Sequence, residues 1–338
     1  MSRTWLIVWL TAVWTFVGAV WWTHRGTPSP EHDHALSLDK LIAKVADPPT
    51  SEWLIGFGSG VTEAENAGDA GCGACHANER ADWAASRHAG ESPAFVACGG
   101  CHQHEGTIYG ANASPAAAPH ATLSREEFRS PAFCARCHDA KGDKTLAGKR
   151  ITETTQEWLR TDAAAAGKTC ISCHMPNGRH LWKGVYDKEM VAGAITANVR
   201  FMTQGTDVAG KFSMTNTGAG HRLPTTAGPE LVMSIDQLDS TALPIAGTHA
   251  EAIVGRRLDD AATIELFDTR LLPGEVKVLP YIAALHPDAR AFRARVECRP
   301  AEGERRRLAW ADEDARELAA TLATRFTAWE EIVRLPAE

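Results

Sequence analysis

The chain has 338 residues, which is room for two domains, and a formal net charge of −7. Charged residues make up 23% of it and form no basic stripe, so the composition argues against a nucleic-acid-binding protein. Eight of the nine cysteines fall into four copies of one short pattern, described below. Only Cys298 lies outside these copies, so the sequence offers no disulfide framework.

The N-terminal segment, residues 1–25, is predicted to be a single transmembrane helix. Residues 5–22 contain no charged side chain and would span about 27 Å as a helix, just enough for a bilayer. Trp5 and Trp22 stand at its two ends, where interfacial aromatic residues are expected. The alternative is a cleaved signal peptide, with residues 17–19 as the small-residue cleavage site. Residues 26–51 are predicted to be a linker.

Residues 52–194 contain four copies of the pattern C-x-x-C-H within a region that is rich in Ala, Gly and His. The cysteines of the four copies are Cys72, Cys75, Cys98, Cys101, Cys134, Cys137, Cys170 and Cys173, and the histidines are His76, His102, His138 and His174. In this pattern the two thiols can form thioethers with the two vinyl groups of one porphyrin, and the histidine then lies under the iron. Zinc ribbons also use paired cysteines, but they do not need the histidine.

The motifs therefore predict four covalently bound haem c groups in residues 52–194, wrapped by short helices and loops. Four porphyrins would supply the apolar core that this region lacks in its own side chains. Because haem is attached to such proteins outside the cytoplasm, either interpretation of residues 1–25 places the region on the periplasmic side. The expected location is the inner membrane, with a soluble periplasmic protein as the alternative.

The sixth coordination position of each iron decides function, since a haem with two protein ligands carries electrons and a haem with one can bind a small molecule. Four histidines outside the motifs are candidate second ligands: His88, His120, His180 and His221. His104 is a reserve candidate, because it lies too close to His102 to reach the opposite face of the same porphyrin. Four candidates for four irons favour an electron carrier, with other redox proteins or membrane quinol-linked donors as partners. The alternative is a reductase or oxidase of a small nitrogen or sulfur compound at one five-coordinate haem.

Residues 195–300 contain short, partly alternating apolar runs bounded by turns, which predict a β-sandwich. Cys298 lies in one of these runs and is predicted to be a buried structural thiol. Residues 311–335 are predicted to be a helix, because Leu318, Leu322, Phe326, Trp329 and Val333 recur at helical spacing.

Several segments beyond the motifs resemble the multihaem cytochrome c family that includes the small tetrahaem electron carrier of nitrifying bacteria. They include the residues around Trp83 and His88, Ala118-Pro119-His120, residues 154–158, and the Gly-His-Arg-Leu-Pro-Thr run at His221. The resemblance implies two histidine ligands for most haems, with His88, His120, His180 and His221 as the distal set. It also implies that the β-sandwich is an appended domain of longer members. It does not assign each distal histidine to an iron.

Overall fold

The computed structural model describes residues 69–89, 97–104, 106–116, 118–139, 145–146, 149–150, 152–259, 264–311 and 315–336. All of them belong to one compact unit, Asp47–Glu338. The predicted membrane segment and linker, residues 1–51, lie outside the described residues. No helix within the described ranges is long and apolar enough to span a membrane.

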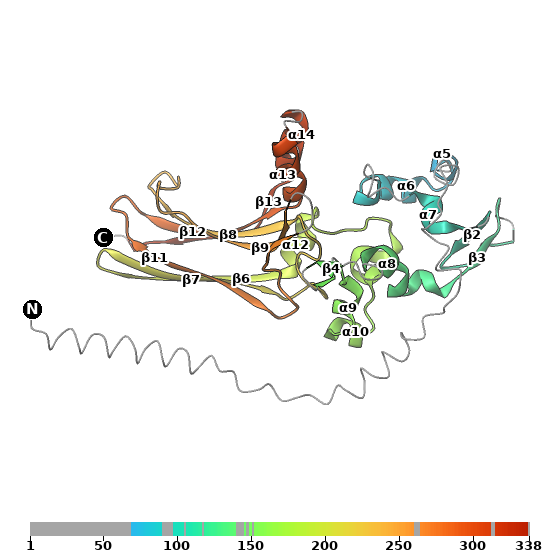
Figure 1. The fold of residues 1–338 in the computed structure, drawn as a ribbon, viewed down its shortest axis with the longest axis horizontal. Coiled ribbons are helices and arrows are strands. Elements are labelled where there is room, and N and C mark those ends of the chain that lie inside the picture. The colour runs from blue at the N-terminus through green and yellow to red at the C-terminus, as the bar shows by residue number, and fades with distance from the viewer. Residues whose placement is uncertain are drawn as a thin grey trace, which may run out of the picture. The chain divides into compact units, whose positions relative to one another are not determined.

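The motif-bearing part of the chain is built from short helices joined by loops (Figure 1). Its helices are α5 (Asp69–Cys72), α6 (Ala77–Ala84), α7 (Cys98–His102), α8 (Pro131–His138), α9 (Thr154–Trp158), α10 (Asp162–Ala165), α11 (Cys170–His174) and α12 (Lys188–Ala194), with 3₁₀ turns η1 (Arg87–Ala89), η2 (Glu126–Arg129) and η3 (Pro176–Gly178). Short strands β1 (Gln103–His104), β2 (Thr107–Gly110) and β3 (Thr122–Ser124) form one sheet, and β4 (Thr145–Leu146) pairs with β5 (Lys149–Arg150).

Three of these helices end at a motif histidine, because the pattern needs one helical turn to bring its two cysteines to one side. They are α7, α8 and α11. Helix α8 is started by Ser130, whose hydroxyl accepts the backbone N–H of Ala132. Helix α11 is started by a capping box between Thr169 and Ser172. The first motif differs, since its histidine, His76, lies at the N-cap of α6.

The C-terminal part is a sandwich of two sheets (Figure 1). Its strands are β6 (Ile195–Gln204), β7 (Asp207–Asn216), β8 (Glu230–Leu238), β9 (Ala250–Leu258), β10 (Glu265–Asp268), β11 (Val276–Ala284), β12 (Ala291–Arg299) and β13 (Phe326–Arg334). One sheet has the order β10-β9-β8-β12-β13 and the other β11-β7-β6, and their strands pair antiparallel.

The core of the sandwich is made by alternate side chains of both sheets. On β7, Phe212 and Met214 are fully buried, and on β12 Phe292 and Cys298 are fully buried as well. Phe292 stacks on Phe201 of β6, with ring centroids 4.3 Å apart. Cys298 is thus a buried thiol, as predicted. Its Sγ donates to the carbonyl of Val185, 3.4 Å away.

The prediction of one helix over residues 311–335 is wrong. The segment contains the end of α13 (Glu302–Ala311), the helix α14 (Ala315–Ala323) and the strand β13. Strand β13 is rich in β-branched and aromatic residues, and it pairs with β12 at the edge of the larger sheet. Trp329 reaches Phe212 of the other sheet, 5.2 Å between ring centroids. Tertiary pairing therefore overrides a helical spacing that Phe326, Trp329 and Val333 share by coincidence.

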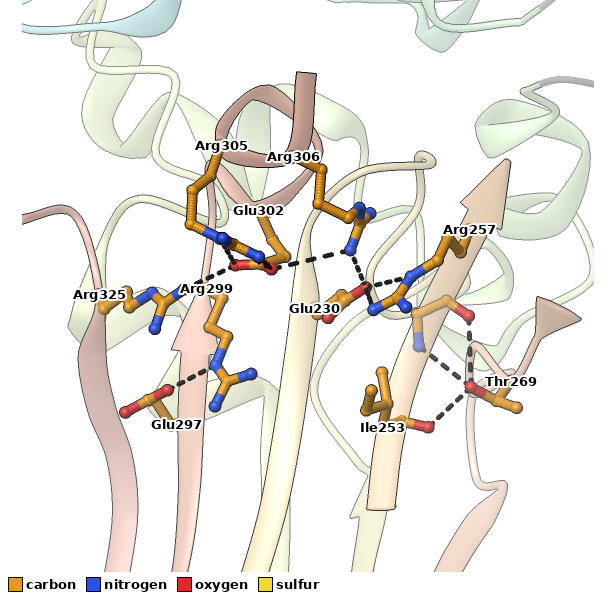
Figure 2. Close-up of polar contacts among 11 residues, drawn as sticks. Glu230, Ile253, Arg257, Thr269, Glu297, Arg299, Glu302, Arg305, Arg306 and Arg325 are labelled. Carbon is orange, nitrogen blue, oxygen red and sulfur yellow. Dashed lines mark hydrogen bonds and ion pairs between the residues drawn. The ribbon is translucent and has the colours of Figure 1, made fainter. Parts of the chain in front are cut away.

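Two buried carboxylates fasten the base of α13 to the sandwich (Figure 2). Glu230 of β8 accepts hydrogen bonds from Arg257 of β9 and Arg306 of α13, at 2.8 and 2.7 Å. Glu302 of α13 accepts from Arg305 of the same helix and from Arg325, which precedes β13. Charge-assisted bonds of this kind compensate the burial of the two glutamates.

Candidate functional site

Each of the four motif histidines faces one of the four predicted distal histidines across a gap of nearly constant width. The distances between imidazole centroids are 6.1 Å for His76 and His120, 6.0 Å for His102 and His180, 6.3 Å for His138 and His88, and 6.1 Å for His174 and His221. These are pairs 1 to 4, in the order of the motifs along the chain. The reserve candidate His104 lies in β1 and is not one of these eight rings.

The width of the gap fits two ligands on opposite sides of one metal ion. With a metal–nitrogen bond of about 2 Å and a centroid about 1.1 Å beyond the nitrogen, two trans imidazoles have centroids roughly 6.2 Å apart. A tetrahedral ion would hold them at about 5 Å. No group of three or more His, Cys, Asp or Glu side chains that could hold a metal ion occurs among the described residues.

The planes of the paired rings differ from one pair to the next. They are 46° apart in pair 1, 45° in pair 2, 87° in pair 3 and 13° in pair 4. Two imidazoles on a common axis can rotate about that axis independently, so all four angles are compatible with axial ligation. Pair 3 is nearly perpendicular and pair 4 nearly parallel.

Three of the eight paired histidines use Nδ1 for a hydrogen bond to a backbone carbonyl. The pairs of residues are His102 with Tyr109, at 2.8 Å, His174 with Lys183, and His221 with Arg222, at 2.8 Å. A fourth, His120, has its Nδ1 3.3 Å from the hydroxyl of Thr122. A ring that donates through Nδ1 presents an unprotonated Nε2, which is the atom that can bind a metal.

Burial keeps several of these imidazoles in the neutral form that ligation requires. Burial, reinforced by His138 and His174, lowers the pKa of His88 to about 4, and burial lowers the pKa of His221 to about 4 as well. Burial also lowers the pKa of His102, His138 and His180. Neutral imidazoles are therefore favoured at these positions near pH 7.

The loop that carries His221 is fixed by a carboxylate from the motif-bearing part of the chain. Glu157 of α9 is 5% exposed and accepts the backbone N–H of Arg222 at 2.8 Å and its Nε–H at 2.9 Å. On the other side, the Asn216 side chain donates to the carbonyl of His221 at 2.9 Å. Burial raises the pKa of Glu157, although its bond to Arg222 opposes the shift. His221 is thus held from both sides.

A second arginine next to a distal histidine is fixed in the same way. Arg179 directly precedes His180, and its Nε donates to Asp82 of α6 at 3.1 Å. The carboxylate is mostly buried, with a side chain 10% exposed, while the arginine is exposed. The hydrogen bond to Arg179 lowers the pKa of Asp82, so the pair stays charged at neutral pH. It connects the α6 segment to the loop that carries His180.

Neighbouring motifs lie against one another. Helices α8 and α11, which carry the third and fourth motifs, are in contact, and so are α5 and α7, at the first and second motifs. The Trp182 ring contacts His180 of pair 2 and His88 of pair 3. The four pairs therefore form one continuous cluster in motif order.

Several members of this cluster were missed by the sequence analysis. Asp82 lies in no recognised motif, and Glu157 lies in residues 154–158, a segment to which the sequence assigned no role; each acts through an arginine far away in the chain. Trp182 was missed as well, although it follows His180 by only two residues and contacts two distal histidines. The sequence signals for these residues were the segment of residues 154–158 and the proximity of Arg179, Trp182 and Arg222 to predicted ligands.

The four C-x-x-C-H motifs each have a second histidine across a gap wide enough for one iron. This is the arrangement expected of a multihaem c-type cytochrome. The chain is similar in structure to a penta-haem cytochrome c552 from Thermochromatium tepidum, with a TM-score of 0.50 and 18% sequence identity. The alignment covers 66% of this chain and 62% of that cytochrome. At this identity the likeness shows a shared fold.

A putative ApaA protein from Bordetella pertussis also aligns, over 43% of this chain and 94% of that protein. Its identity of 13% and TM-score of 0.21 are too low to support an argument. No family model matches the chain. No curated protein matches its sequence.

Proposed function

We propose that the protein binds four c-type haems through the four cysteine pairs and that pairs 1 to 4 are the axial ligands of the four irons. The observation that carries this proposal is the separation of 6.0–6.3 Å between the rings of every pair. When bound, haem would supply one-electron redox chemistry. The protein's function would then be electron transfer.

The histidine pairs favour a carrier over an enzyme. An enzyme that reduces or oxidises a small molecule needs one iron with an open position. Here each motif histidine has a facing partner, so both axial positions of each iron would be filled by the chain itself. Glu157 and Asp82, acting through Arg222 and Arg179, hold two of those partners and oppose their displacement.

We also propose that the protein works on the periplasmic side of the inner membrane, anchored by residues 1–25. The uncharged stretch of residues 5–22 and the need to attach haem outside the cytoplasm support this location. Its partners would be other redox proteins or quinol-linked donors in the membrane. Release of the protein into the soluble periplasmic fraction would instead favour a cleaved signal.

The test is haem content and spin state in the purified protein, followed by substitution of one distal ligand. Mass spectrometry should show the added mass of four porphyrins, and the ferric spectrum should be wholly low-spin. His221→Ala should then convert one haem in four to a high-spin form that binds cyanide. His249→Ala is the matched control, because His249 lies in the sandwich and bonds to Asp236 instead.

Three outcomes would contradict the proposal. Fewer than four porphyrins, or zinc at about one ion per two motifs, would exclude the tetrahaem assignment. A high-spin haem in the unmodified protein would favour the enzyme. A wholly low-spin His221→Ala variant would show that His221 is not a ligand, and His104 would be the next residue to replace.

A further inference from the structure

Trp182 contacts two distal histidines that belong to different pairs. Its ring centroid is 4.8 Å from that of His88 in pair 3 and 5.1 Å from that of His180 in pair 2. The ring planes are 76° and 74° apart, so both contacts are of the edge-to-face type. One indole thus connects the outer sides of two neighbouring ligand sites.

The same two histidines have no conventional partner for their second nitrogen. The Nδ1 atoms of His88 and His180 are buried, and neither has a hydrogen-bond partner among the described residues. A metal-ligating histidine almost always donates this N–H to a carboxylate, a carbonyl or water. Pair 4 shows the usual arrangement, since His174 and His221 both bond to backbone carbonyls.

The backbone at Trp182 supports a specific role for its side chain. Its φ of +38° lies in the left-handed region, which a residue with a bulky side chain rarely adopts. Such a conformation is strained and persists only where the surroundings fix it. Here the loop places His180, the Trp182 ring and the carbonyl of Lys183, the acceptor for His174, within four residues.

We propose that Trp182 is the shared outer partner of the distal ligands of pairs 2 and 3, receiving the Nδ1–H of His88 and of His180 on its ring. This inference rests on the proposed axial ligation. An N–H bond to an aromatic ring is weaker than one to a carbonyl, so it transfers less electron density to the imidazole. A less basic ligand stabilises ferric iron less. The sites of pairs 2 and 3 therefore have higher reduction potentials than the site of pair 4.

The experiment is a potentiometric titration followed by electron paramagnetic resonance. Near-perpendicular and near-parallel imidazole planes give different low-spin ferric signals, so the 87° of pair 3 and the 13° of pair 4 separate their sites. The unmodified protein must first show four low-spin haems, since their absence would refute the proposed function rather than this inference. The pair 3 signal should then disappear at a higher potential than the pair 4 signal.

Two substitutions of Trp182 distinguish tuning from mere packing. Trp182→Phe keeps an aromatic face. It should change the equilibrium constant for reduction at pair 3 by less than threefold. Trp182→Gln supplies an amide oxygen that accepts an N–H. It should make reduction at pairs 2 and 3 about tenfold less favourable, which is about 59 mV for one electron. Pair 4 should not move in either variant.

Trp329→Phe is the matched control, because Trp329 packs on Phe212 inside the sandwich. All four potentials should stay unchanged in this variant. The inference is overturned if Trp182→Gln leaves pair 3 unchanged, if it shifts pair 4 equally, or if it converts pair 3 to a high-spin form. A pair 3 potential below that of pair 4 in the unmodified protein would also overturn it.

Discussion

The motif-bearing part of the chain and the sandwich are stabilised in different ways. Among the described residues of 69–187, few apolar side chains are buried. They are Ala97, Pro131 and Ala164. The sandwich buries large side chains such as Phe212 and Phe292 completely. A region without an apolar core cannot offset the conformational entropy lost on folding. Its fold therefore depends on a component that its own side chains do not supply, and four porphyrins would be such a component.

The largest expected effect is that the motif-bearing part loses its fold while the sandwich keeps its own. In chain produced without haem attachment, residues 69–187 should exchange their amide hydrogens as an unfolded chain does, while strands β7, β8 and β12 remain protected. Hydrogen exchange read by mass spectrometry on proteolytic peptides measures this, with the haem-loaded protein as the reference. Equal protection of both regions without haem would contradict the comparison.

A smaller effect is expected from a cavity in the sandwich. Phe292→Ala removes a fully buried ring that stacks on Phe201, and should lower the free energy of unfolding by about 3–5 kcal/mol. The loss should appear in the far-ultraviolet transition of the sandwich. The haem absorption spectrum at low temperature should not change, because Phe292 lies in the core of the two sheets. A changed spin state would show that the two parts are not independent.

The smallest effect concerns pH. A hydrogen bond to Asp236, 2.7 Å long, raises the pKa of His249. The pair therefore contributes its full stabilisation below the pKa of histidine in the unfolded chain, about 6.5. That contribution is lost as the pH rises through the higher pKa of His249 in the folded protein. His249→Gln should lower the melting temperature slightly at pH 5.5 and less at pH 8.5. The imidazole is half exposed, so solvent screens the pair. A larger decrease in melting temperature at pH 8.5 than at pH 5.5 would contradict a raised pKa for His249.

The local parts of the site could be predicted from the sequence, and the long-range parts could not. The four motifs carry their own geometry, and the four distal candidates follow from counting histidines near them. Which histidines pair depends on long-range contacts in the folded chain. His138 faces His88, which precedes it in the sequence, while His102 faces His180, which follows it by 78 residues. Glu157 acts only through such a long-range contact, and so does Trp182 toward His88.

The fold shows the same division. The strands β6 to β12 lie within residues 195–300, where alternating apolar runs predicted a β-sandwich, because alternation is a local property. Strand β13 was predicted to be a helix, because its pairing with β12 is decided by a partner about 30 residues earlier. The propensity of residues 326–334 alone does not carry that information.

The sequence intervals enclosed by the four histidine pairs overlap. Pair 1 spans residues 76–120, pair 3 spans 88–138, pair 2 spans 102–180 and pair 4 spans 174–221. Each interval begins before the previous one has ended, so a single peptide-bond cut anywhere between residues 76 and 221 falls inside at least one of them. If each pair ligates one iron, as proposed, a nicked chain would stay joined through iron at every such position. Pair 4 is completed only by His221, which lies between β7 and β8, so the sandwich supplies one of its two histidines.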